Sequence, residues 1–117
     1  MIRMRAPTVD ELVAEWLSGE EVTMADGLLP PFADPEAVWQ AVLRLMQHEL
    51  SEEQIALLAA GPVEDLLALY GAQFIDRMEA EARRSPAFAH VLGGVWRRGM
   101  PEALWQRVEL ARGGNVW

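Results

Sequence analysis

Apolar residues recur along this chain at the three- and four-residue spacing of a helix. The first segment places five of them at positions i, i+3, i+4, i+7 and i+8, on one helical face: Val9, Leu12, Val13, Trp16 and Leu17. Thr8 and Glu11 have the spacing of a capping box, in which the hydroxyl and the carboxylate each accept a backbone N–H. The pattern predicts an amphipathic helix that begins behind Thr8 and ends at Ser18-Gly19.

Residues 19–33 interrupt this pattern. Glycine and proline, which commonly break helices, occupy four of the positions: Gly19, Gly27, Pro30 and Pro31. The segment is predicted to be a loop that can include one helical turn. We expect it to be packed down by its own large apolar side chains, which are Leu28, Leu29 and Phe32.

Start and stop signals divide the rest of the chain into five more helices. Asp34-Pro35 and Ser85-Pro86 each combine an N-cap with a proline at the first helical position. Ser51 to Gln54 forms a second capping box. Gly61-Pro62 is predicted to end a short helix, and Gly93-Gly94 is predicted to bend or end a later one. Helices are therefore expected to begin near residues 34, 51, 62, 85 and 101.

Tryptophan is frequent in this chain and lies mainly on the apolar helix faces. Four tryptophans are predicted to be core residues for that reason: Trp16, Trp39, Trp96 and Trp105. Trp117 follows Gly113-Gly114 and is expected to be either disordered or docked. Gly71 lies in the middle of the long helix, where glycine costs up to ~1 kcal/mol relative to alanine, so it predicts a close crossing with another helix.

The sequence thus predicts an all-α fold. The expected architecture is a compact single-domain bundle of five to six helices with short connections, spanning residues 1–117. Residues 1–7 and 112–117 are expected to be flexible.

Composition excludes several kinds of chemistry. The chain has no cysteine, which removes disulfides, thiolate metal sites and a cysteine nucleophile. The net charge is −8, with +2 on residues 1–7, −14 on residues 8–82 and +4 on residues 83–117. Because an acidic body repels phosphate backbones, nucleic-acid binding is not expected.

Hydropathy predicts neither a membrane span nor a leader. The longest nearly charge-free run, residues 55–63, has roughly half the length of a membrane helix and contains Gly61-Pro62. The first residues hold no apolar run of signal-peptide length. A cytoplasmic location without membrane contact is therefore expected.

No motif for a metal or cofactor stands out, and none is expected to bind. His48-Glu49 and Glu52-Glu53 are the only place where histidine meets several carboxylates, but the helix break at Leu50-Ser51 separates them. His90 lies between core positions of its helix and is expected to have a packing role. Catalytic residues are likewise not assigned.

A few charged residues remain as candidates for partner binding. Glu64-Asp65 suits the helix dipole better than acid–base catalysis, because adjacent helical residues point about 100° apart. Asp76, Glu79 and Arg83 share one face, and the order predicts an ion pair between Glu79 and Arg83 of ~0.2–0.5 kcal/mol. The candidate partner-binding residues are Glu64, Asp65, Asp76, Glu79, Arg83, Arg97, Arg98 and Trp117.

Several short runs resemble those of one known family. They are Gly61 to Leu67 (Gly-Pro-Val-Glu-Asp-Leu-Leu), Leu92 to Trp96 (Leu-Gly-Gly-Val-Trp), Tyr70-Gly71 and Leu104-Trp105. Together they resemble a family of small bacterial helical proteins that is catalogued only as a domain of unknown function. The resemblance covers about residues 34–110 and implies a bacterial stand-alone helical protein. It implies no catalytic residues.

Three hypotheses for function remain. The first is a non-enzymatic acidic module that binds another protein, similar in kind to an immunity protein or a regulatory partner. The second is a small-molecule-binding or enzymatic domain that uses Glu64, Asp65, Asp76 or Glu79, with Arg83 and Tyr70. The third is a homo-oligomeric structural protein, of which a homodimer is the simplest form.

Overall fold

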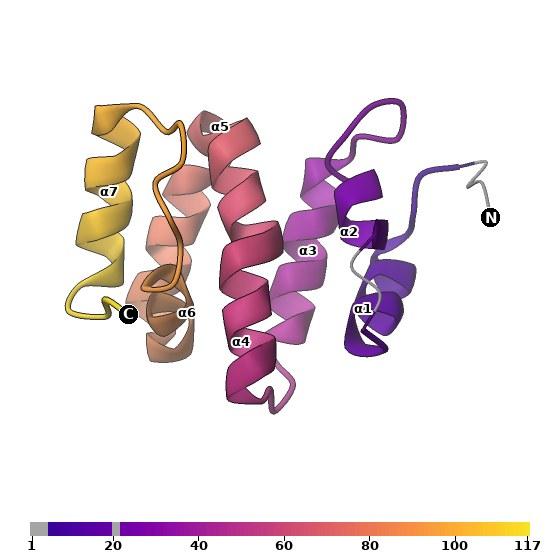
Figure 1. The fold of residues 1–117 in the computed structure, drawn as a ribbon, viewed down its shortest axis with the longest axis horizontal. Helices are drawn as coiled ribbons and strands as arrows, with labels where there is room; N and C mark the ends of the chain where they lie inside the picture. The colour runs from indigo at the N-terminus through magenta and orange to yellow at the C-terminus, as the bar shows by residue number, and fades with distance from the viewer. Residues whose placement is uncertain (1–4, 20–21) are drawn as a thin grey trace. The chain divides into compact units, whose positions relative to one another are not determined.

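The computed structural model describes residues 5–19 and 22–117, and this part of the chain is helical without β-strands (Figure 1). In chain order, the helices are α1 (Val9–Leu17), α2 (Val22–Asp26), α3 (Pro35–Leu45), α4 (Glu52–Leu58), the π-helical turn η1 (Ala59–Val63), α5 (Glu64–Arg84), α6 (Pro86–Leu92) and α7 (Glu102–Arg112). The predicted all-α class is confirmed. α4, η1 and α5 follow one another directly, with kinks at Gly61 and Tyr70, and counted as one run they leave six helical segments in the described residues, within the expected five to six.

The helices belong to two compact units, residues 1–49 and residues 50–117. In the first unit, α1 packs against α2 and α3. Its buried apolar residues include Leu12, Trp16, Val38, Trp39, Val42 and Leu45. The predicted capping box is present, because the Glu11 N–H donates to Thr8 Oγ1 (3.2 Å) and the Thr8 N–H to Glu11 Oε1 (3.1 Å).

The loop before α3 differs in part from its prediction. It contains α2, and Leu28 is buried as expected, but Leu29 is half exposed. At Gly27 the loop lies so close to α3 that a Cβ would be 2.7 Å from Val38 Cγ2. The expected single domain and the expected flexibility of residues 1–7 stay predictions, and residues 1–4 lie outside the described part.

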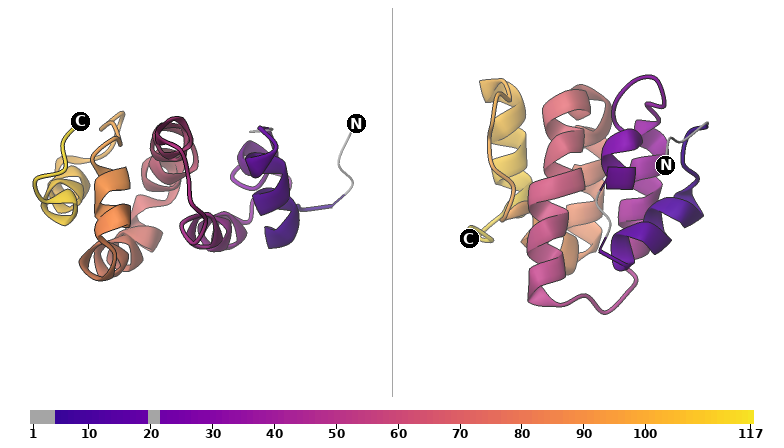
Figure 2. Two further views of the ribbon diagram at one scale, coloured as in Figure 1. Left: turned by 90° about the horizontal axis from the view of Figure 1, so that it is seen from below. Right: turned by 45° about the vertical axis from the view of Figure 1, so that its right-hand side comes forward.

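The second unit consists of α4, η1, α5, α6 and α7, with α6 in contact with both α5 and α7 (Figure 2). The predicted helix break at Gly61-Pro62 takes the form of a kink between two helical stretches, with the π turn η1 joining them. Pro62 has no N–H and its ring crowds the carbonyl four residues earlier, so regular α-helical bonding cannot continue through it. Gly61 departs from helical dihedral angles at that point (φ −103°, ψ −106°).

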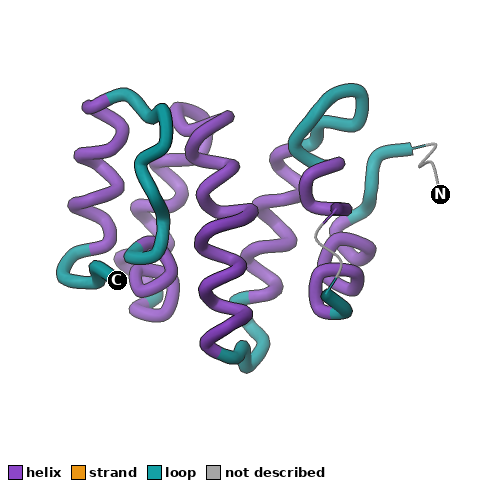
Figure 3. The backbone as a smooth tube through the Cα atoms, in the orientation of Figure 1, coloured by secondary structure: helices purple, strands orange, loops and turns teal. Residues whose placement is uncertain are grey.

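The helical run over residues 52–84 is not straight: it kinks at Gly61, and at Tyr70 the chain turns so that the rest of α5 runs back toward α6 (Figure 3). By length and composition it could cross a membrane, because an 18-residue window reaches a mean hydropathy of 1.4. Of that window, 44% is buried inside the molecule, and a single helix of this kind is weak evidence for a membrane span. The apolar stretch is thus longer than the run of residues 55–63, from which the sequence predicts no span. The absence of membrane contact stays a prediction.

Gly71 in α5 marks a close helix crossing, as the sequence predicts. A Cβ at this position would overlap the side chain of Leu104 in α7, so glycine lets the two helices approach. The kink at Tyr70 (φ −135°, ψ 29°) lies directly before it.

Alanine in place of Gly71 is expected to lower the free energy of unfolding by about 1 kcal/mol. Helix propensity favours alanine by ~1 kcal/mol, but the displacement of Leu104 costs ~1–3 kcal/mol. Urea denaturation measures the difference, with Gly114→Ala as control because a Cβ there meets no atom within 4 Å. A more stable Gly71→Ala variant would show that Leu104 moves aside without cost.

Candidate functional site

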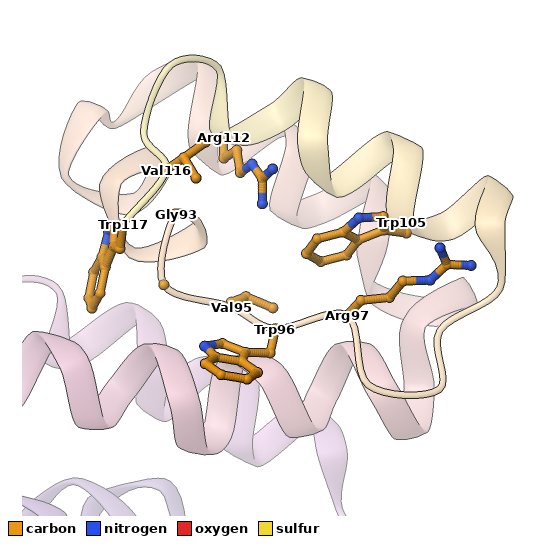
Figure 4. A pocket seen from close by; sticks show the side chains of 9 residues that line it. Gly93, Val95, Trp96, Arg97, Trp105, Arg112, Val116 and Trp117 are labelled. Atoms are coloured by element: carbon orange, nitrogen blue, oxygen red, sulfur yellow. The ribbon is translucent and has the colours of Figure 1, made fainter.

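The segment between α6 and α7 and the last residues of the chain line a cleft of about 270 Å³ in the second unit (Figure 4). Its walls are three tryptophans and two arginines: Trp96, Trp105, Trp117, Arg97 and Arg112. The backbone of Gly93, Gly94 and Val95 and the side chain of Val116 complete the lining. The cleft is therefore a largely aromatic hollow with cationic groups beside it.

Two carboxylates at the start of α5 hold one wall of this cleft in place. Glu64 is buried, and its Oε1 accepts the backbone N–H of Trp96 at 2.8 Å. Arg98 pairs with Asp65, and its Nη1 lies 3.5 Å from Glu64 Oε2. The hydrogen bond to Asp65 raises the pKa of Arg98. Of the predicted site residues, Glu64, Asp65 and Arg98 are thus brought together, as an anchor for the segment that carries Trp96.

Trp96 corrects a sequence prediction, because its side chain is 76% exposed instead of belonging to the core. The helical periodicity that placed it inward stops at Leu92, where α6 ends, and residues 95–97 lie outside any helix. Trp16 and Trp39 are buried as predicted, and Trp105 is partly exposed. The error follows from extending one stripe across Gly93-Gly94.

Trp117 is docked rather than free. Its backbone N–H donates to the Gly93 carbonyl (3.2 Å), and its Nε1–H donates to the His90 carbonyl (2.8 Å). Its ring centroid lies 5.3 Å from that of His90, and the side chain is 53% exposed. Residues 113–117 therefore fold back on α6, although their flexibility stays a prediction.

This docking explains Gly93-Gly94. A Cβ at Gly94 would lie 2.7–2.8 Å from three carbons of the Trp117 ring, and a Cβ at Gly93 would overlap the backbone of Asn115. The two glycines permit the close packing of the tail, and so they serve the construction of the cleft.

Arg112 lies deepest among the cationic groups of the cleft. Its side chain is 14% exposed, and its guanidinium carbon lies 5.2 Å from the Trp105 ring centroid, within cation–π range. Nη2 is 3.6 Å from a Glu109 carboxylate oxygen, whereas Nε is buried without a hydrogen-bond partner. Arg97, in contrast, has two close partners. Its Nη1 lies 2.8 Å from Glu102 Oε2, and its Nε–H donates to the Met100 carbonyl at 3.3 Å.

The other candidate carboxylates lie on α5 and bind α7. Arg107 Nε donates to Glu79 Oε2 at 3.0 Å, and the same guanidinium pairs with Asp76. These bonds lower the pKa of Glu79 and raise that of Arg107. The predicted Glu79–Arg83 ion pair is wrong: Glu79 pairs with Arg107, 28 residues away, and Arg83 acts on it only as a more distant charge.

These contacts bear on the hypothesis of acid–base chemistry. The carboxylates of Glu64 and Glu79 each form an ion pair with an arginine, and the side chain of Asp76 is largely exposed. Within the described residues, no group of three or more His, Asp or Glu side chains is placed to hold a metal ion. His48 contacts the Arg44 carbonyl through Nδ1 (3.1 Å).

A second hollow of about 310 Å³ lies between α5 and α7, in the same unit. It is apolar and is lined by residues that include Leu67, Ala68, Ile75, Pro101 and Leu104. Arg107 is the one charged residue among its lining residues, and that arginine is bound to Asp76 and Glu79.

Comparison with known proteins places the chain in one family. The model described as "Family of unknown function (DUF6869)" matches residues 15–116. The match extends beyond the resemblance seen over residues 34–110, into α1. Neither a protein of curated function nor a solved structure matches the chain.

Proposed function

Since the chain belongs to this family of unknown function, we propose its role from the structure: a non-enzymatic module that binds another protein through the tryptophan cleft of its second unit. The observation that carries the proposal is Trp96, whose indole is 76% exposed while its backbone is anchored by a buried carboxylate. Tryptophan and arginine are enriched among the residues that dominate binding energy at protein interfaces.

The neighbourhood of Trp96 supports the same role. Trp117 is 53% exposed and Trp105 is partly exposed, so all three tryptophans that line the cleft have exposed surface. Clustered exposed apolar surface in a monomer is typical of interaction sites. The Trp117 ring is held by its hydrogen bond to the His90 carbonyl and by close contact with Gly94, so this ring would require little ordering on binding.

The charge distribution supports a protein as the partner rather than nucleic acid or a membrane. Residues 1–49 carry nine acidic side chains against three arginines, a charge of −6. Residues 50–117 carry nine against seven, a charge of −2. An acidic protein repels phosphate, and its field accelerates association with partners that carry basic groups outside the contact.

The enzymatic hypothesis gains no support from the site, because Glu64, Asp65, Asp76 and Glu79 are bound by Arg98 and Arg107. The homo-oligomeric hypothesis depends on the solution state. Sedimentation at micromolar concentration decides it, and a strict monomer rules it out.

Capture from a lysate of the native host tests the proposal. The full chain serves as bait in three forms: wild type, Trp96→Ala and Leu110→Ala, the last because Leu110 is 80% exposed and does not line the cleft. We expect the same protein to be retained by wild type and Leu110→Ala and lost with Trp96→Ala. Equal retention by all three baits, or no capture at low and at physiological salt, would contradict the proposal.

Trp96→Ala is expected to leave the free energy of unfolding within about 0.5 kcal/mol of wild type, since little of the side chain is buried. Urea denaturation of the two proteins checks this. A loss of several kcal/mol would mean that the indole has a structural role, and the loss of capture would then follow from unfolding.

A further inference from the structure

The guanidinium of Arg112 has only one long ion pair, with Glu109, among the described residues. Its Nε is buried without a hydrogen bond, and its contact with Glu109 is 3.6 Å long. The group points into the space between Trp105 and Trp117 (Figure 4). Arg112 lines the cleft, and a hydrogen bond from its guanidinium to an incoming carboxylate oxygen would carry charge on both partners and would therefore be strong.

The neighbouring arginines do not offer the same opportunity. Arg97 is paired with Glu102, and Arg98 is paired with Asp65. A doubly charged group such as phosphate would therefore meet one guanidinium, whose ion pair with Glu109 is long, in a unit whose net charge is −2. The charge available fits a single carboxylate, which guanidinium binds with a matching geometry.

The rest of the cleft selects a flat apolar group beside that carboxylate. Trp96 and Trp117 both line the cleft, and both residues have exposed surface. Aromatic pairs prefer offset or edge-to-face contacts with indole rings of this kind. A volume of about 270 Å³ is near the lower end for small-molecule pockets, and it suits one or two side chains of a peptide.

We propose that the cleft binds a partner segment in which Asp or Glu directly adjoins an aromatic residue. The carboxylate binds Arg112, and the aromatic ring packs against Trp96 and Trp117. This inference rests on the proposed function and adds the chemistry of the partner. The acidic character of the protein does not prevent it, because charges beyond ~8 Å are screened at physiological salt.

Titration with blocked tetrapeptides, followed by tryptophan fluorescence, tests the inference. The probes are acetyl-Gly-Asp-Phe-Gly-amide, the form with Phe and Asp reversed, and versions in which Asp is Asn or Phe is Ala. We expect one Asp–Phe order to bind about tenfold more tightly than both its Asn and its Ala version. Equal binding of the Asp and Asn peptides, or no binding of either Asp–Phe order, overturns the inference.

Two variants of the protein test whether the peptide carboxylate binds Arg112. Arg112→Gln is expected to abolish the preference for Asp over Asn. Arg84→Gln is the matched control, because Arg84 is an exposed arginine paired with Glu81 and lies outside the cleft. It is expected to leave the preference unchanged. If Arg112→Gln keeps the preference, the carboxylate binds elsewhere and the inference is wrong.

A measurement on the wild-type protein covers the case in which Arg112→Gln does not fold. In ¹H–¹⁵N spectra, the Nε–H signal of Arg112 is expected to move on addition of the Asp peptide and to stay in place with the Asn peptide. A signal that ignores the Asp peptide overturns the inference. Phenylacetate that binds as tightly as the peptide also overturns it, in favour of a small-acid site.

Failure of this inference and failure of the proposed function are distinguishable. If the peptides fail but capture from lysate still depends on Trp96, only the partner chemistry is wrong. If the peptides bind through Arg112 but Trp96→Ala captures the same proteins as wild type, the assignment of the cleft as the main interface is wrong.

Discussion

Replacing Gly93 by alanine is expected to release residues 115–117 from α6. The new Cβ would overlap the backbone of Asn115, and backbone cannot move aside as the end of a side chain can. The tail must then give up both hydrogen bonds of Trp117, to the Gly93 and His90 carbonyls. We expect the free energy of unfolding to fall by about 2 kcal/mol, the usual cost of overpacking a close contact.

Gly99→Ala is the control for this variant. Gly99 belongs to the same segment between α6 and α7, but a Cβ there meets no atom within 4 Å. We expect Gly93→Ala to lower the urea midpoint and to leave Trp117 open to a soluble fluorescence quencher, while Gly99→Ala does neither. If Gly93→Ala matches wild type in both measurements, the tail is not docked as described.

The same variant links the tail to binding. Trp117 forms one wall of the cleft, so its release would weaken capture of the partner and binding of the Asp–Phe peptides. Deletion of the side chain alone, as in Trp117→Ala, should weaken binding to a similar degree. A partner that binds Gly93→Ala as it binds wild type would show that only the Trp96 side of the cleft is used.

Local signals in the sequence predicted the helices well, because their causes are local. The capping boxes at Thr8 and Ser51 and the N-caps at Asp34 and Ser85 each involve residues three apart in the chain. Such bonds form wherever the local spacing is right. Gly71 was also informative, since the helix accepts the poor propensity of glycine where a neighbouring helix leaves no room for a Cβ.

The features that define the cleft depend on distant residues and were not predictable in this way. Trp96 is anchored by Glu64, 32 residues earlier, and Glu79 is paired with Arg107 instead of the nearby Arg83. Helical spacing identifies neighbours only within one helix. Arg112 was missed entirely, although the clustering of arginine and tryptophan in the last third of the chain was a signal for it.

Glu64→Ala is expected to have the other large effect, because it removes the anchor of the Trp96 segment. The Trp96 N–H would lose its acceptor in a part-buried position, and Arg98 would keep only its pair with Asp65. Leaving a buried donor unsatisfied costs ~1–3 kcal/mol, so we expect a loss of about 2 kcal/mol in the free energy of unfolding. Arg98 also holds a left-handed backbone (φ 50°), which its two carboxylate partners help to maintain.

Two milder substitutions separate the hydrogen bond from the charge. Glu64→Gln keeps an oxygen that can accept the Trp96 N–H, so it should lose less than half as much stability as Glu64→Ala. Asp65→Asn removes a carboxylate from a solvent-accessible pair with Arg98, which is worth about 0–1 kcal/mol. Urea denaturation should therefore rank Glu64→Ala as the least stable, and capture of the partner should fall in the same order. If Asp65→Asn costs as much as Glu64→Ala, the ion pair and not the backbone hydrogen bond holds Trp96 in place.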